Sequence, residues 1–137
     1  MGRVNFGWRL EDQRKGIDQG VVVNWHLHDG WTQYPLPLTD LSGLDFSGEW
    51  QEGLPGFYRF TLTVDEAADT FLDFQGWGKG CVFVNGFNLG RFWDVGPQRR
   101  LYLPGPLLRE GENEIILFET EGKVGESITL WAEPDLG

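Results

Sequence analysis

The stretch from Gly76 to Trp93 holds the residue types that could bind a flat, polar ligand. Aromatic rings can stack against a sugar ring, and amide and guanidinium groups can hydrogen-bond to hydroxyl groups. The neighbouring glycines would let a ligand or another protein segment approach the backbone closely. Because tryptophan is also a common core residue, burial is the alternative for each large ring. The candidate contacts, with a sugar or with another domain, are Trp77, Asn88, Arg91, Phe92 and Trp93.

Two histidines, His26 and His28, lie two positions apart and would share one face of a strand, with Asp29 beside them. A metal site needs further ligands, and the sequence supplies no third ligand at a recognised spacing. We therefore predict a solvated strand face here and no zinc site. A calcium ion held by loop oxygens stays open, because no EF-hand pattern occurs and other calcium sites leave no spacing signature.

Three acidic pairs could in principle act as general acid and base, but all lie in polar, loop-like stretches where solvated surface is the ordinary role. They are Glu11 with Asp12, Glu49 with Glu52, and Asp65 with Glu66. The Gly-Lys-Gly run at 78–80 lacks the spacing and the Ser or Thr of a phosphate-binding loop. We predict no catalytic residue, no metal ligand and no cofactor.

The same stretch must also form a hairpin, because Asn85-Gly86 between two β-patterned runs favours a two-residue type I′ turn. That turn would place Val84 opposite Phe87, Phe83 opposite Asn88, Val82 opposite Leu89 and Cys81 opposite Gly90. One face of the hairpin would then be entirely apolar and would belong to the core. Its members are Val82, Val84, Phe87 and Leu89, so Asn85, Gly86, Phe87 and Leu89 are assigned structural roles.

Composition places this hairpin in a single all-β domain. The 137 residues include 20 glycines and 15% aromatic side chains, which suits many short strands joined by turns. A net charge of -10 argues against nucleic-acid binding, and no apolar run reaches the roughly 20 residues of a membrane span, so neither partner is expected. Cys81 is the only cysteine, which is more typical of the cytoplasm than of an oxidising compartment.

Alternating apolar and polar residues predict about eight strands in an antiparallel β-sandwich of the jelly-roll kind, with a closed barrel as the alternative. One turn of helix is expected near 104–113, and a long surface loop over 38–56. Apolar residues on both faces of 114–118 indicate a central strand. The strands are expected at 20–29, 57–64, 70–76, 81–85, 87–93, 99–104, 113–120 and 127–133.

A longer motif adds a family resemblance to this pattern. Residues 76–119 read GWGKGCVFVNGFNLGRFWDVGPQRRLYLPGPLLREGENEIILFE, and MGRVNFG, KGI and WTQYPLPL precede them. This order of Gly-Lys-Gly, Asn-Gly, Leu-Gly-Arg-Phe-Trp and Gly-Pro-Gln closely resembles the C-terminal β-domain of the family 35 glycoside hydrolases, the β-galactosidases. Cys81, Phe83 and Phe92 depart from the residues common in that family, which leaves sugar-specific contacts open.

The resemblance implies a galactose-binding-like jelly roll without catalytic residues. In that family a (β/α)₈ barrel of about 250 residues carries two catalytic glutamates, so this chain is expected to be a tail fragment. Residues 1–19 would continue from an upstream domain and 20–137 would form the sandwich. The implied partners are the catalytic barrel and another β-domain, on which this domain would pack. The alternatives are a carbohydrate-binding module that recognises galactosides and a subunit-assembly surface.

Overall fold

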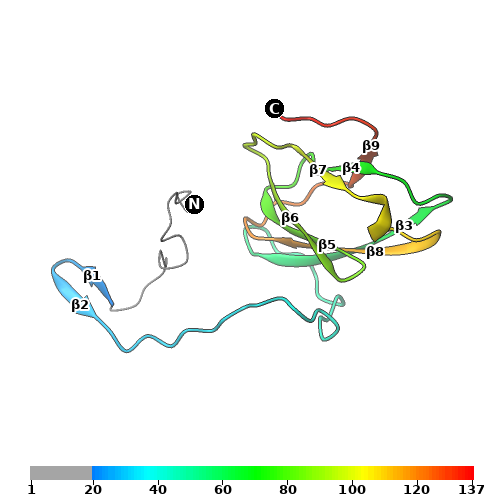
Figure 1. Cartoon of the computed structure of the whole chain (residues 1–137). Coiled ribbons are helices and arrows are strands. Elements are labelled where there is room, and N and C mark those ends of the chain that lie inside the picture. Colours follow the sequence, from blue (N-terminus) through cyan, green and yellow to red (C-terminus); the bar gives the residue numbers. More distant parts are fainter. Residues whose placement is uncertain (1–19) are drawn as a thin grey trace, which may run out of the picture. The chain divides into compact units, whose positions relative to one another are not determined.

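The computed structural model describes residues 20–137, so the predicted leading segment, residues 1–19, lies outside the described part of the chain. The chain divides into two compact units, residues 1–37 and residues 38–137. All strands from β3 onward belong to the second unit (Figure 1). Within residues 20–137, no helix has the length and the apolar character needed to cross a membrane.

The described part of the first unit contains a short hairpin of β1 (Val21–Val23) and β2 (His26–His28). The prediction of one continuous, half-buried strand across this region was wrong. Asn24 and Trp25 have φ angles of 48° and 66°, which reverses the chain in a two-residue turn. The alternation of apolar and polar residues therefore runs across a turn, and both short strands are largely exposed.

The second unit is an antiparallel β-sandwich of a four-stranded and a three-stranded sheet, which confirms the predicted fold class (Figure 1). The first sheet has the order β3 (Gly56–Val64), β8 (Gly111–Glu119), β5 (Lys79–Val84) and β6 (Phe87–Trp93). The second has the order β7 (Arg100–Leu103), β4 (Thr70–Asp73) and β9 (Thr129–Trp131). The predicted helical turn is a single 3₁₀ turn, Gly105–Leu107.

Strand β8 lies between β3 and β5 and is buried on both faces, as its sequence predicted. Ile115 and Leu117 point into the sandwich core, and Ile116 is 4% exposed on the opposite face. The loop before β3 covers part of that outer face, because Leu44 and Phe46 line one pocket with Ile116. The predicted surface loop over 38–56 therefore shields the outer side of the sheet.

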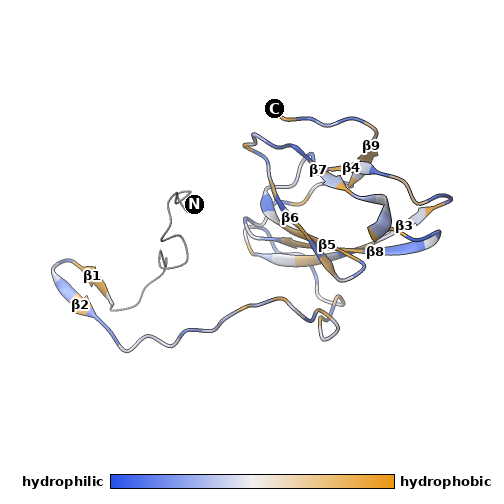
Figure 2. Ribbon diagram, viewed as in Figure 1, coloured by the Kyte–Doolittle hydropathy of each residue, from blue (hydrophilic) through white to orange (hydrophobic). Residues whose placement is uncertain are grey.

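The core between the two sheets is built from apolar side chains that several strands contribute. Figure 2 shows apolar residues distributed over the strands of both sheets. Burying these side chains supplies the main driving force for folding, at about 25 cal/mol for each Å² removed from water. The buried members of the cluster are Leu72, Phe74, Trp77, Val82, Val84, Phe92, Leu103, Leu108, Ile115 and Leu117.

The predicted turn between β5 and β6 is confirmed, since Asn85 and Gly86 have φ angles of 49° and 82°. The pairs Val84 with Phe87 and Phe83 with Asn88 are also as predicted. Beyond them the register shifts, and Val82 lies opposite Gly90 where Leu89 was expected. Leu89 is the additional residue of this β-bulge, which the two-residue turn alone does not predict.

The predicted burial of Phe87 was wrong, because this side chain is 54% exposed. Its partner Val84 is fully buried, so the pairing places Phe87 beside the core as expected. However, β6 is an edge strand, and Phe87 has a neighbouring strand on one side only. Leu89 packs against the core while partly buried. Pairing thus predicts the neighbour of Phe87, while its burial depends on what lies beyond the sheet edge.

A buried amide fixes the tip of this hairpin to one end of β8. Asn113, which is 1% exposed, donates from Nδ2 to the carbonyls of Arg109 and Gly111 at 2.8 and 3.1 Å. Its Oδ1 accepts from the Arg109 N–H and from Asn85 Nδ2, at 2.9 and 2.8 Å. Asn85 Oδ1 in turn accepts the N–H of Glu114. The Asn-Gly turn is therefore held by tertiary hydrogen bonds as well as by local backbone preference.

A buried carboxylate organises the opposite end of β8. Glu119 is fully buried, and its Oε1 accepts the N–H of Lys79 at 3.0 Å. Its Oε2 accepts the N–H groups of Glu121 and Lys123, both at 3.0 Å. A Cβ at Gly78 would lie 2.8 Å from Glu119 Oε1, so glycine leaves room for the carboxylate. The Gly-Lys-Gly run therefore packs around a structural acid.

Replacing Asn113 with alanine should destabilise the fold strongly, because several buried backbone groups would lose their partners. We expect Asn113→Ala to lower the free energy of unfolding by about 2–3 kcal/mol in urea titrations. Asn88→Ala, at an exposed position of β6, should change the free energy of unfolding by less than about 0.5 kcal/mol. Equal effects for the two variants would contradict the role assigned to Asn113.

Replacing Glu119 with glutamine tests whether acceptor atoms, rather than volume, hold the loop after β8. The introduced NH₂ group would face a backbone N–H, so we expect Glu119→Gln to lower the Tm by about 5–10 °C. Glu112→Gln, exposed on the same strand, should leave the Tm nearly unchanged. If calorimetry gave the same Tm for both variants, the carboxylate would not have this function.

Candidate functional site

Two of the predicted contact residues, Trp77 and Phe92, are core residues, each 2% exposed. The Trp77 indole Nε1 donates to the carbonyl of Ser127 at 3.0 Å, and its ring meets the Tyr58 ring edge-on. Phe92 stacks on Phe74 with ring centroids 4.7 Å apart. Both rings therefore serve the packing of the sandwich, and neither is presented to a ligand at the surface.

The other predicted contacts, Asn88, Arg91 and Trp93, lie toward the surface on β6. Asn88 and Arg91 are exposed, and Trp93 is partly buried. The Arg91 guanidinium and the Lys79 ammonium each lie 5.2 Å from the Trp93 ring centroid. Asn88 is at the turn end of β6, away from Trp93 at its far end. The structure thus brings Arg91 and Trp93 together and leaves Asn88 apart from them.

Trp93 lines a pocket of about 350 Å³, here named the two-tryptophan pocket. Its walls come from both sheets, because the end of β6 meets the end of β4, the start of β7 and the segment from β9 onward. No single sequence segment contains it. The lining residues are Asp73, Phe74, Gln75, Gly76, Trp93, Asp94, Arg99, Arg100, Trp131 and Asp135.

Arg100 is fixed within this pocket by three different contacts. Its Nε donates to Asp73 Oδ2 at 3.0 Å, and a second guanidinium nitrogen donates to the carbonyl of Glu133 at 3.1 Å. Its guanidinium also lies 3.9 Å from the centroid of the Trp131 ring. Trp131 is 47% exposed, and its indole Nε1 donates to Thr129 Oγ1. The second tryptophan is therefore held in position while much of it faces solvent.

Sequence reasoning missed Arg100 and Trp131 as site residues. Both lie in segments that were predicted as strands, but nothing in the sequence indicated that the strands flank the same neighbour. The pairing of β4 with both β7 and β9 brings them together, with Asp73 opposite Arg100 and Phe71 opposite Trp131. The one available signal was an arginine, an aspartate and a tryptophan within three of the predicted strands.

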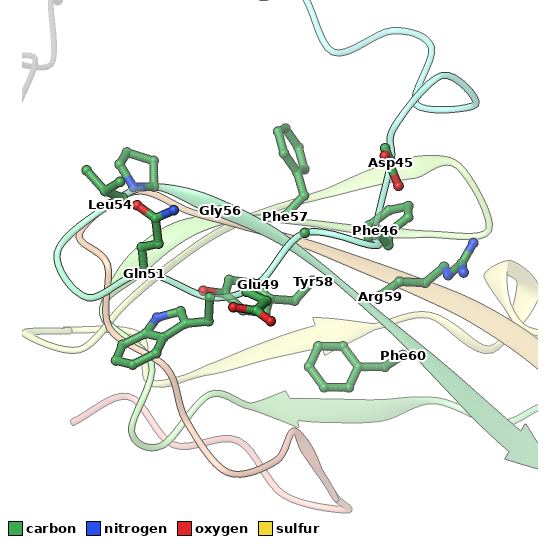
Figure 3. Close-up of a pocket in the computed structure, with 13 residues that line it drawn as sticks. Asp45, Phe46, Glu49, Gln51, Leu54, Gly56, Phe57, Tyr58, Arg59 and Phe60 are labelled. Carbon is green, nitrogen blue, oxygen red and sulfur yellow. The ribbon is translucent and has the colours of Figure 1, made fainter.

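A larger open pocket of about 580 Å³, here named the β3 pocket, lies between β3 and the loop before it (Figure 3). Phe57 is directed away from Tyr58 and Phe60, as strand alternation requires. Burial raises the pKa of the Tyr58 hydroxyl, and the charge of Glu119 adds to this rise. The exposed Trp50 and Leu54 make part of the wall apolar.

Several acidic side chains of the sandwich already have structural partners. Asp69 accepts the Tyr102 hydroxyl at 2.6 Å and the Gly105 N–H at 2.8 Å, and these bonds lower the pKa of Asp69. Asp94 forms an ion pair with Lys123, which raises the pKa of Lys123. Together with Asp73 and Glu119, these carboxylates hold loops and strand ends.

Metal-binding and thiol chemistry have little support in the described residues. Between residues 20 and 137, no three His, Cys, Asp or Glu side chains are grouped closely enough to hold a metal ion. His26 and His28 are exposed on β2. Cys81 is partly buried, and burial raises the pKa of its thiol, which lowers its reactivity at neutral pH.

Comparison with known proteins gives one consistent family. Residues 55–113 match the family described as the β-galactosidase galactose-binding domain. The chain is 48% identical to β-galactosidase 1 of Dictyostelium discoideum, over 87% of this chain and 19% of that protein. It is 41% identical to β-galactosidase-1-like protein 2 of Homo sapiens, over 99% of this chain and 22% of that protein. It is 40% identical to β-galactosidase 17 of Arabidopsis thaliana, over 88% of this chain and 20% of that protein.

The family match begins just before β3 and ends within β8, so it covers most of the sandwich. The chain spans about a fifth of the length of the curated relatives it matches. Its β-sandwich fold agrees with the resemblance drawn from the Gly-Lys-Gly, Asn-Gly and Gly-Pro-Gln motif. The shared motif, the fold and these comparisons agree that residues 55–113 match the galactose-binding domain of the β-galactosidases.

Proposed function

We propose that this chain is a non-catalytic domain of a β-galactosidase-like glycoside hydrolase, and that it packs on the catalytic barrel and stabilises it. The relatives named as β-galactosidases are about five times longer than the segment they share with this chain. A barrel alone takes about 250 residues. The chemical step is therefore assigned to a part of such an enzyme outside this domain.

The claim that this domain is non-catalytic rests on the carboxylates that already form structural hydrogen bonds and ion pairs. A retaining glycosidase needs two carboxyl groups about 5 to 5.5 Å apart, one on each side of the scissile bond. In the sandwich, Asp69, Asp73 and Glu119 are bound by a hydroxyl, a guanidinium and backbone N–H groups respectively. Carboxylates fixed in this way maintain the fold, and moving them toward a substrate would break these bonds.

Exposed apolar side chains support the claim that this domain packs on another domain. Monomeric proteins seldom expose many large apolar side chains close together, and such groups often mark interaction surfaces. In the second unit, Trp50 and Leu54 of the β3 pocket are 54% and 53% exposed. A partner domain would cover these groups.

The purified 137-residue chain should hydrolyse no galactoside. We expect no release of nitrophenol from p-nitrophenyl β-galactoside above the buffer rate, because the catalytic pair is assigned to another domain. The Dictyostelium relative serves as the active control. Turnover that co-purifies with the chain and disappears on heat unfolding would contradict the proposed division of labour.

The packing role can be tested in a chimera in which this chain replaces the matching segment of the Dictyostelium relative. Trp50→Ala with Leu54→Ala should lower the Tm of the chimera clearly, because truncating buried interface anchors costs roughly 2–4 kcal/mol. The same pair should leave the isolated chain nearly unchanged, since both side chains are exposed there. Val95→Ala with Val124→Ala, also exposed, is the matched control. An unchanged Tm for the Trp50 and Leu54 pair would exclude this surface as the packing face.

A further inference from the structure

The turn between β5 and β6 contains two groups that can react with each other. The backbone nitrogen of Gly86 can attack the side-chain carbon Cγ of Asn85, because glycine has no Cβ to hinder the approach. The other asparagines of the chain are followed by larger residues, as Asn88 is by Leu89. Asn85 is therefore the asparagine whose sequence most favours closure of a succinimide ring.

Solvent access does not protect this turn. Asn85 and Gly86 are both exposed. A Cβ placed on Gly86 would meet no atom within 4 Å outside the two neighbouring residues. Water, which opens a succinimide once it has formed, therefore reaches the site. Any protection must come from the way in which Asn85 itself is held.

Four tertiary hydrogen bonds hold Asn85 against the start of β8 and the 3₁₀ turn. Its Nδ2 donates both to the Leu107 carbonyl and to Asn113 Oδ1, at 2.8 Å in each case. Its Oδ1 accepts the Glu114 N–H at 3.0 Å, and its own N–H donates to the Glu114 carbonyl at 2.9 Å. The carboxamide is thus bonded through both of its N–H groups and through its oxygen.

This bonding opposes the reaction directly. Attack at Cγ turns a planar carboxamide carbon into a tetrahedral one and expels Nδ2, so the bonds from Nδ2 to Leu107 and Asn113 must break. The acceptors are part of the fold, because Asn113 is 1% exposed and is itself bonded to the 109–113 turn. The reaction therefore requires the tip of the hairpin to separate from β8, a local opening of the kind that edge elements undergo.

We propose that Asn85 is a deamidation site which the native fold keeps closed and which local opening of the hairpin tip exposes. The Gly86 nitrogen bonds to Cγ, the Cγ–Nδ2 bond breaks, and Nδ2 leaves as ammonia with the proton from the Gly86 nitrogen. One water molecule then opens the succinimide at either carbonyl carbon, which gives aspartate or isoaspartate. This inference does not rest on the packing role.

The modification would prevent the tip from returning to its native contacts. An aspartate at position 85 has no N–H to donate to the Leu107 carbonyl or to Asn113 Oδ1, and its carboxylate would face both oxygens. Isoaspartate routes the main chain through Cγ and lengthens the turn, which disturbs the pairing of Val84 with Phe87. Each opening that leads to reaction is therefore irreversible.

The first test incubates the full chain in mildly alkaline buffer, with and without guanidinium chloride at an unfolding concentration. Peptide mapping by tandem mass spectrometry then measures conversion at each asparagine. We expect Asn85 to convert at least about thirtyfold more slowly in the folded chain, because opening breaks several hydrogen bonds. Asn88 should convert little in either state. Equal rates at Asn85 in the two states, or no conversion in the unfolded chain, would overturn the proposal.

A second test separates local opening from global instability. Asn113→Ala removes one acceptor of the Asn85 carboxamide, whereas Glu119→Gln weakens the opposite end of β8 and leaves the Asn85 contacts in place. Where circular dichroism shows both variants folded, Asn85 should convert at least about fivefold faster in Asn113→Ala. Equal rates in the two folded variants would contradict protection by these bonds. The comparison in guanidinium chloride decides the matter if either variant does not fold.

The consequence of modification is measured with Asn85→Asp, which reproduces the aspartate product. We expect this variant to lower the Tm by about 5–10 °C, because the donated hydrogen bonds are lost. Asn88→Asp adds the same charge at an exposed position of β6 and should leave the Tm nearly unchanged. The same Tm for both variants would refute the claim that modification releases the hairpin tip. All three tests use the isolated chain, so they are independent of the chimera.

Discussion

The architecture depends on the polar anchoring of β8 at both of its ends. This strand lies between β3 and β5 and is buried on both faces, so its terminal backbone groups and loops must be satisfied inside the protein. Asn113 does this at one end through the 109–113 turn and the hairpin, and Glu119 does it at the other through the 119–123 loop. Hydrophobic burial drives the two sheets together, while Asn113 and Glu119 fix the conformations of the turn before β8 and the loop after it.

This anchoring also determines which aromatic residues serve the core and which remain at the surface. The loop organised by Glu119 leads to Ser127, whose carbonyl accepts the Trp77 indole N–H, so Trp77 is held inside. Glycine at position 125 is needed there, because a Cβ would lie 2.5 Å from the Trp77 ring. Trp93 and Trp131 instead lie at strand ends where the two sheets meet, which leaves their rings partly accessible.

The two-tryptophan pocket and the β3 pocket suit different kinds of partner, because their walls differ in rigidity and in polarity. The two-tryptophan pocket has paired charges and a fixed guanidinium, which suits a small polar ligand. The β3 pocket is wider, is bordered by a long loop and exposes Trp50 and Leu54, which suits a protein surface. The two surfaces share no lining residue.

The sequence by itself determined the antiparallel sandwich, most strand positions, the Asn85-Gly86 turn and the family resemblance, because periodicity, turn chemistry and motif order are local properties. It mistook the β1–β2 turn for a strand, since Asn24 and Trp25 follow the alternation while adopting positive φ. Only tertiary structure decided that Phe87 is exposed, that Trp77 and Phe92 are buried, and that Arg100 meets Trp131. Which side chains are exposed, and which meet in one pocket, depends on the order of the strands and on which strands lie at a sheet edge. Both arise from contacts between residues far apart in the chain.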